Sequence, residues 1–298
     1  MNMKKFLFKN IFAVEIKNLD LSDLDNLKEM DYLENLPKTQ KENLGLTSFL
    51  ENDNLYEKVG HCIFFKVKKE KKDVPSSVVN EMLEKKKKEY FNLNQTPLPK
   101  KEQKAVKEDI IVSLLPKAFI KSTYIEFYID TKNNYLVVNG SSSKKMDEVV
   151  TLLKNLGVDF NISLIEPNFD LTEEMTKWVK ENEAKEPFNI GTSCSLFDPI
   201  SSGEIVYKNL EISENNDQLL HNLDHNNLVK ELELDWHERI TFKLSNEFIL
   251  KSISITDSFE ETVSEDLGDA EDQYNYFIGT MSIFVEDIAE IISDILKK

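Results

Sequence analysis

Fifteen lysines between Gly60 and Lys121 are the side chains with the most evident chemistry, and only 8 Asp or Glu accompany them. An ammonium group binds phosphate as a point charge, and a segregated basic surface is typical of proteins that bind nucleic acid. The rest of the chain is acidic, and the formal net charge is −17. Charges more than about 10 Å apart are largely screened at physiological salt. One basic surface could therefore bind a polyanion on an acidic protein, although such charge runs more often only keep helices solvated.

Spacing ranks these lysines. Lys100, Lys104 and Lys107 share one helical face, whereas the successive residues 85–88 point around most of a helix. A helix that begins near Ser143 would add backbone N–H groups that favour phosphate. Arg239 is the only arginine, so we expect binding with little sequence preference. The predicted DNA-binding residues are Lys66, Lys68, Lys69, Lys100, Lys101, Lys104, Lys107, Lys117, Lys121, Lys144 and Lys145.

Other candidates for chemistry are weaker. His221 and His225 have the i, i+4 spacing of zinc ligands, but no third ligand is evident. Asp109 together with Asp130-Thr-Lys132 loosely resembles a magnesium-dependent nuclease site, yet the segment after Asp130 also fits a hairpin turn. We therefore expect no catalytic residue, no metal and no cofactor, with a metal-dependent DNA nuclease as the alternative function.

Two single residues have open interpretations. Arg239 could contact phosphate or form an ion pair with Asp235 or Glu238. Cys62, which follows His61 in a predicted strand, is expected to be buried and not catalytic. With Cys194 it makes only two cysteines, which favours a reducing compartment. No signal peptide and no apolar run of about 18 residues is evident, so we expect a cytoplasmic protein without a membrane span.

The elements that would position these residues follow from periodicity and from the prolines. Strands are predicted at Phe6–Ile16, His61–Val67, Phe119–Asp130, Tyr135–Asn139, Glu231–Leu244 and Phe248–Thr256. Helices are predicted from Pro75 to the break at Asn92–Pro99, over Lys100–Leu115, from Ser143 to Gly157, from Asp170 through Val179, and over Tyr276–Leu296. Asp20–Lys41 has apolar residues near helical spacing, Lys68–Asp73 is predicted as a charged turn, and Leu196–Asn216 is loop-rich. Strands and helices alternate without a regular βαβ order, which favours the α+β class.

Short segments in a constant order carry a family resemblance. The segment Lys107–Phe119 ends in Ser-Leu-Leu-Pro-Lys-Ala-Phe and resembles the Ser-Leu-Leu-Pro-Arg-Ala-Phe segment of the recombination-associated protein RdgC family. Further similar segments are Phe8–Asn10, Val74–Val78, Tyr128–Thr131, Ser143–Lys145, Leu152–Gly157, Thr176–Val179 and Leu232–Ile240. They extend over nearly the whole chain.

The resemblance implies a horseshoe-shaped subunit that pairs with a second copy into a ring dimer. It implies a hole lined with basic residues that encircles duplex DNA, single-stranded DNA being a second form it could bind, and modulation of RecA-dependent recombination by occluding DNA. Phe119 matches a phenylalanine that inserts across the subunit contact, and Lys117 matches a basic residue beside it. The protein would be nucleoid-associated.

We therefore expect an elongated, curved subunit of three modules. Residues 1–73 and 117–165 would form a central antiparallel sheet module, residues 74–116 a lysine-rich helical tip, and residues 166–298 a C-terminal base module. The expected protein is not an enzyme. A third possibility is a protein-binding module whose lysine-rich tip contacts an acidic partner.

Overall fold

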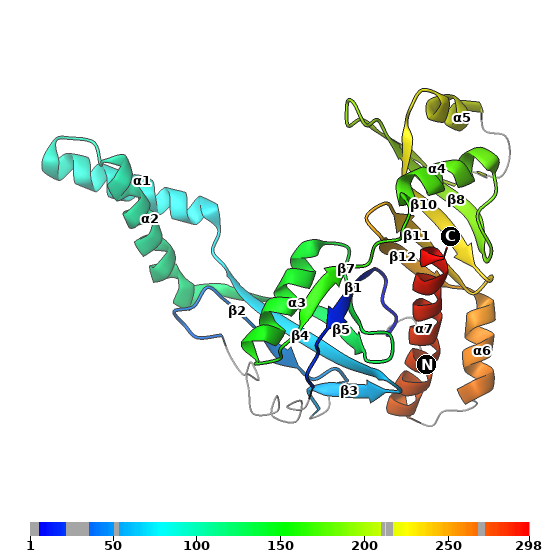
Figure 1. Cartoon of the computed structure of the whole chain (residues 1–298). Helices are drawn as coiled ribbons and strands as arrows, with labels where there is room; N and C mark the ends of the chain where they lie inside the picture. Colours follow the sequence, from blue (N-terminus) through cyan, green and yellow to red (C-terminus); the bar gives the residue numbers. More distant parts are fainter. Residues whose placement is uncertain are drawn as a thin grey trace. The chain divides into compact units, whose positions relative to one another are not determined.

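Strands and helices are mixed along the chain in a computed structural model, which describes residues 6–21, 36–50, 54–209, 212, 217–267 and 272–297 (Figure 1). This confirms the α+β class. The strands are β1 (Ile11–Lys17), β2 (Glu42–Thr47), β3 (Tyr56–Val59), β4 (Cys62–Asp73), β5 (Phe119–Asp130), β6 (Tyr135–Asn139), β7 (Asn161–Leu164), β8 (Phe188–Phe197), β9 (Glu204–Tyr207), β10 (Leu228–Trp236), β11 (Ile240–Ser245) and β12 (Ile249–Ile255). The helices are α1 (Ser76–Asn94), α2 (Lys100–Leu114), the short 3-10 helix η3 (Leu115–Lys117), α3 (Ser143–Asn155), α4 (Leu171–Glu181), α5 (Asp217–Asp224), α6 (Asp257–Leu267) and α7 (Gln273–Leu296).

The strands form one open antiparallel sheet in the order β2-β4-β5-β6-β1-β12-β11-β10-β8-β9, with β3 paired to β4 and β7 to β1. Consecutive strands β10, β11 and β12 are neighbours, because short turns join them. Strand β1 lies inside the sheet. Strand β6 pairs along one edge of β1, and β12 pairs with the other edge at Ile11 and Phe12. Its mostly apolar sequence is what an inner strand requires.

The described residues divide into two compact units. Unit 1 comprises those within 1–23, 48–65 and 126–298, and unit 2 comprises those within 24–47 and 66–125. The three modules expected from the sequence stay a prediction.

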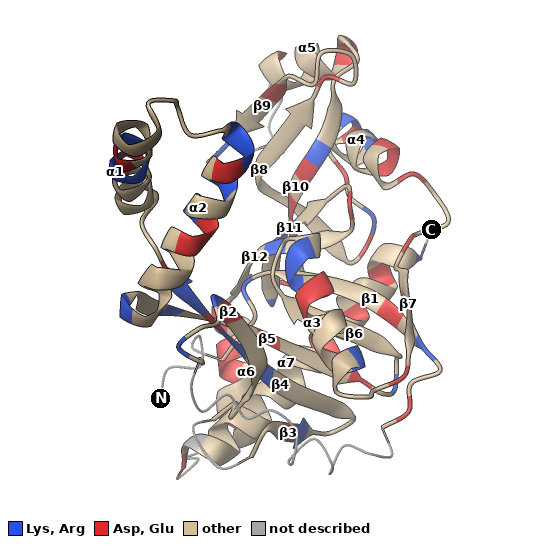
Figure 2. Cartoon of the chain, turned by 90° about the vertical axis from the view of Figure 1, so that its left-hand side faces the viewer, with Lys and Arg blue, Asp and Glu red and all other residues tan. Residues whose placement is uncertain are grey.

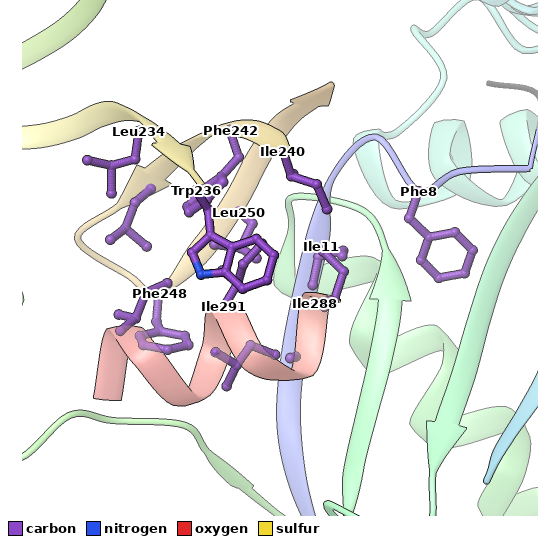
Figure 3. Close-up of a cluster of buried hydrophobic side chains, with 14 of the residues drawn as sticks. Phe8, Ile11, Leu234, Trp236, Ile240, Phe242, Phe248, Leu250, Ile288 and Ile291 are labelled. Atoms are coloured by element: carbon purple, nitrogen blue, oxygen red, sulfur yellow. The ribbon is translucent and has the colours of Figure 1, made fainter. Parts of the chain in front are cut away.

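Unit 1 has a large apolar core, part of which Figure 3 shows around Trp236. The face of α7 that carries Phe277, Met281, Phe284, Ile288, Ile291 and Ile295 is fully buried, which confirms the helical spacing of that segment. Ile288 and Ile291 lie beside the Trp236 ring (Figure 3). The indole Nε1 of Trp236 donates to Asp294 Oδ2 at 3.0 Å, so its polar edge is satisfied.

Local signals set several element ends as predicted. Asp170 caps α4, because its carboxylate accepts hydrogen bonds from the backbone N–H groups of Thr172 and Glu173. Strand β5 begins at Phe119 and ends at Asp130, as the sequence predicts. The hairpin between β11 and β12 is confirmed at residues 245–249.

Two predictions about local structure are wrong. Lys68–Asp73 is not a turn, because β4 continues through it and pairs with β2 from Thr47 to Glu42. Glu231–Leu244 is two strands, since the chain turns at His237 and Glu238, both with positive φ, without the glycine or asparagine that usually marks such a turn. Most described residues of the segment predicted as loop-rich, 196–216, do lie outside strands, although it also contains the end of β8 and all of β9.

Most of the segment predicted near helical spacing at Asp20–Lys41 lies outside the described residues. Within the described part of the chain, no helix has the length and apolar character needed to cross a membrane.

Candidate nucleic-acid interface

Helices α1 and α2 of unit 2 pack against each other and carry most of the lysines. Val79 and Leu83 of α1 meet Ile110 of α2 in a small buried cluster. Pro75 and Pro99 immediately precede the two helices, where a fixed φ and a missing N–H cost little. These three apolar residues therefore face the other helix, whereas Phe91 and Leu93 of α1 and Val112 of α2 are exposed.

Glutamates of the same helix pair with the lysines of α1. The Nζ atoms of Lys85, Lys86 and Lys87 lie 2.7, 2.8 and 2.7 Å from carboxylate oxygens of Glu81, Glu89 and Glu84. Figure 2 shows the resulting mixture of blue and red on α1. Such exposed pairs contribute little to stability, but they cancel charge locally. This helix is therefore a poor phosphate-binding surface, as its four successive lysines suggest.

The lysines of α2 have a different environment. The side chains of Lys100, Lys104 and Lys107 are exposed. Their ammonium groups form no ion pair or hydrogen bond with any residue that the structure describes. At about 100° per residue they lie within about 60° of the helix circumference. Glu102 and Asp109 project from the opposite side by the same geometry. We call these three residues the α2 lysine row.

Lys101, Lys117 and Lys121 are exposed near the α2 lysine row in the sequence, and they too have no polar partner among the described residues. Lys101 belongs to the first turn of α2, Lys117 ends η3 and Lys121 lies near the start of β5. Lys88 of α1 is likewise exposed and unpaired within the described chain. Lys88 is not among the predicted DNA-binding residues, because the four successive lysines 85–88 point around most of the helix and the sequence does not show which of them stays unpaired.

The lysines of β4 are less available than the sequence predicts. Lys66, Lys68 and Lys69 are only partly exposed. Lys68 Nζ forms an ion pair with Glu70, and Lys66 Nζ lies 5.3 Å from the centroid of the Tyr124 ring. Because β4 is a paired strand here and not a turn, these side chains lie over the sheet. They can contribute to the local potential, but they already have partners.

Phe119 is not a core residue, although it begins a long strand. Its side chain is 88% exposed, and Ile120, Tyr124 and Val112 in the same unit are about half exposed. Exposed apolar side chains of this size are typical of surfaces that another molecule covers. Ile120 and Tyr124 were missed from the sequence, because strand alternation alone does not show which face lacks a covering layer.

Lys144 and Lys145 lie at the start of α3, in unit 1. Lys144 is exposed and has no polar partner in the described chain, whereas Lys145 Nζ donates to the backbone oxygen of Asn139 at 3.1 Å. A side chain on Gly140 would meet Lys145 Cδ at 2.5 Å, so glycine leaves room for this lysine. Of the two, Lys144 is the better phosphate ligand.

The residues considered for a nuclease have other roles. Asp130 Oδ1 accepts hydrogen bonds from the backbone N–H groups of Lys132 and Asn133 at 3.0 and 2.9 Å, which is the predicted hairpin turn. Asp109 is an exposed residue of α2 in unit 2, whereas Asp130 belongs to unit 1.

The remaining candidates are structural as well. The ring centroids of His221 and His225 lie 4.1 Å apart with the rings tilted by 46°, and His225 Nδ1 bonds to the backbone oxygen of His221 at 2.7 Å. Arg239 pairs with Asp287 at 2.8 Å and donates to Thr262, so neither partner expected from the sequence is used. Burial raises the pKa of Asp287 by more than the neighbouring Arg239 guanidinium lowers it.

Comparisons with known proteins bear on these surfaces. The family model described as "Putative exonuclease, RdgC" matches residues 6–298. A recombination-associated protein RdgC of Pseudoalteromonas translucida (strain TAC 125) is 34% identical over 196 residues, which cover 65% of this chain and 64% of that protein, just under two thirds of it. The protein of that name in Neisseria meningitidis serogroup C / serotype 2a is 30% identical over 207 residues, 68% of each chain. The one in Pseudomonas putida (strain GB-1) is 27% identical over 210 residues, 70% of this chain and 68% of that protein. The chain belongs to the RdgC family of recombination-associated proteins.

Proposed function

We propose that this protein acts in recombination by binding duplex DNA, with little sequence preference, through the α2 lysine row and the neighbouring Lys101, Lys117 and Lys121. The observation that carries the proposal is that these ammonium groups are exposed and have no carboxylate partner among the described residues, whereas three of the four lysines of α1 have one. Lysines bind phosphates as point charges and release counterions, so affinity does not depend on base sequence. Single-stranded DNA would bind by the same contacts.

The proposal includes a homodimer. Phe119, Ile120 and Tyr124 of β5 are exposed apolar side chains that a second copy could cover. Two curved copies would close a ring around DNA, with basic residues inside and acidic residues outside. DNA held in this way is occluded from RecA, so the protein would restrain recombination from the nucleoid without cleaving any bond.

A second candidate is a metal-dependent exonuclease, because the description of the matching family model names that activity. The relatives themselves are named for recombination and not for an enzyme. Hydrolysis would need carboxylates that converge on Mg²⁺. The names of the relatives therefore favour the binding function.

A salt titration separates these functions. The protein is mixed with linear and covalently closed duplexes of the same sequence, with and without Mg²⁺. With about six phosphate contacts, log affinity should fall against log salt with a slope of about −5. A ring should remain on the closed duplex at salt that removes it from the linear one, and pre-bound protein should slow RecA strand exchange.

Other outcomes would support the alternatives. Loss of DNA ends only with Mg²⁺ would favour the exonuclease. If the protein does not bind DNA even at low salt, the proposal is wrong. The remaining function for the lysines would then be binding of an acidic protein.

A further inference from the structure

Two turns of unit 1 that are far apart in sequence meet in space. The backbone N and the Oγ1 of Thr131, in the β5–β6 turn, donate to the backbone oxygen of His61, in the β3–β4 turn, at 3.1 and 2.7 Å. Gly60 takes a φ of +57° beside it, which glycine adopts without strain. This contact places the side chains of His61 and Cys62 next to Asp130.

These three side chains form a compact set of metal-binding atoms. A ring nitrogen of His61, the Sγ of Cys62 and a carboxylate oxygen of Asp130 lie within 4.8 Å of one another. His61 Nε2 is buried, has no hydrogen-bond partner and lies 3.4 Å from Asp130 Oδ1. Cys62 is fully buried. A buried ring nitrogen without a partner is costly unless something else satisfies it.

We propose that His61, Cys62 and Asp130 bind a zinc ion. Imidazole, thiolate and carboxylate are the ligands that zinc uses in proteins. Glu286 Oε1 of α7 lies 3.5 Å from His61 Nδ1, whereas His61 Nε2 faces Asp130, so Glu286 can accept the Nδ1–H and orient the ring as an outer contact. With bonds of about 2.0–2.3 Å, a tetrahedral zinc holds its ligand atoms about 3.3–3.8 Å apart. The three side chains therefore need only a small closure.

The surroundings already orient one ligand. Asp130 accepts from the backbone N–H groups of Lys132 and Asn133, and from Asn133 Nδ2 at 2.8 Å. Outer contacts of this kind fix a metal ligand and strengthen binding. The ammonium of Lys132, 3.4 Å from Glu286 Oε2, is the positive charge that opposes the ion. Its side chain is exposed, so it can turn toward solvent.

The thiol must lose its proton when zinc binds. Burial, together with the Asp130 and Glu286 carboxylates, raises the pKa of the Cys62 thiol, so without a metal it stays protonated. On binding, the S–H bond breaks, the S–Zn bond forms, and the proton passes to the buffer. The ion would join the two turns, and Glu286 would link the His61 ring to α7. A different use of the same geometry is hydrogen bonding of His61 to the Asp130 and Glu286 carboxylates without a metal, in which Cys62 takes no part.

Cobalt spectroscopy and zinc titration decide between them, and neither depends on DNA binding. Untagged full-length protein is stripped with a chelator and titrated with Co²⁺ and then with Zn²⁺. We expect one ion per chain and a thiolate-to-cobalt absorption band that Zn²⁺ removes. Cys62→Ser should abolish the band, and His61→Gln should weaken zinc affinity by more than about 100-fold, because lost outer contacts alone cost about 10–100-fold.

Matched controls are Cys194→Ser, which alters the other buried cysteine, and His221→Gln on α5; both should bind like the wild type. A wild-type cobalt spectrum without a thiolate band would overturn the proposal, and so would equal zinc affinity in His61→Gln and wild type. If Cys62→Ser does not fold, these two measurements still decide.

Discussion

Replacing the α2 lysine row by glutamine (Lys100→Gln, Lys104→Gln, Lys107→Gln) tests the DNA-binding surface most directly. Each lysine that neutralises a phosphate contributes about 0.9 to the slope of log affinity against log salt. Three contacts therefore contribute about 2.7 to the slope. If their contribution vanishes at 1 M salt, they lower the Kd at 0.15 M salt by about 150-fold, which is about 3 kcal/mol. Fluorescence anisotropy with a labelled duplex over a range of salt measures both quantities.

The matched control removes the same charge from α1 (Lys85→Gln, Lys86→Gln, Lys87→Gln), where Glu81, Glu89 and Glu84 already pair with the lysines. It changes the net charge equally but leaves the α2 lysine row in place. We expect the control to lose less than about tenfold, because the paired glutamates already cancel these charges locally and α1 should make few phosphate contacts. Surface substitutions of either kind should change folding stability by less than about 0.5 kcal/mol each.

Two results would refute this reasoning. One is an α2 variant that keeps the wild-type salt slope, which would mean that the α2 lysine row contacts no phosphate. The other is equal loss in both variants, which would mean that only the net charge of the unit matters and not the face.

Three further predictions concern assembly and stability. Phe119→Ser should raise the dimer dissociation constant about 10–100-fold, because it removes the free energy of burying one phenylalanine. The control Ile200→Ser, which changes a side chain that is 90% exposed, should leave the dissociation constant unchanged. Sedimentation over a range of concentrations measures both. Arg239→Met should lower the free energy of unfolding, measured in urea, by about 2–4 kcal/mol, because it leaves the Asp287 side chain (12% exposed) unpaired. Adding Asp287→Leu should recover most of the loss. An Arg239→Met protein with the wild-type free energy of unfolding would contradict this. Burial raises the pKa of Asp235, so the stability linked to its protonated form is present at low pH and is lost as pH rises through the folded pKa. The free energy of unfolding of Asp235→Asn should therefore gain on that of the wild type as pH rises above the usual aspartate range, and a gain toward acid would show the opposite sign.

An acidic protein can bind DNA only if its acidic residues stay away from the contact. The segregation of lysines into residues 66–121 makes this possible in the sequence, and the pairing on α1 narrows the usable surface to α2 and the residues that follow it. Affinity should therefore depend on few residues. This is why the triple substitution above is expected to have so large an effect.

The sequence by itself determined the features that depend on neighbours within a turn or two. The prolines at 75, 97 and 99 end or begin α1 and α2, Asp170 caps α4, and helical spacing marks the buried face of α7. Each of these results from a local hydrogen bond, a fixed φ or a repeat of apolar residues, all of which can be seen along the chain. The segregation of charge is likewise a property of the sequence alone.

Only the tertiary structure decided what depends on partners distant in sequence. Lys68–Asp73 becomes a strand because β2 pairs with it, and Arg239 pairs with Asp287, 48 residues away. His61 and Cys62 meet Asp130 only because two separate turns come together, so no spacing motif could have shown that cluster. A lysine can be recognised in a sequence, but whether its charge is free depends on which carboxylates the fold brings near it.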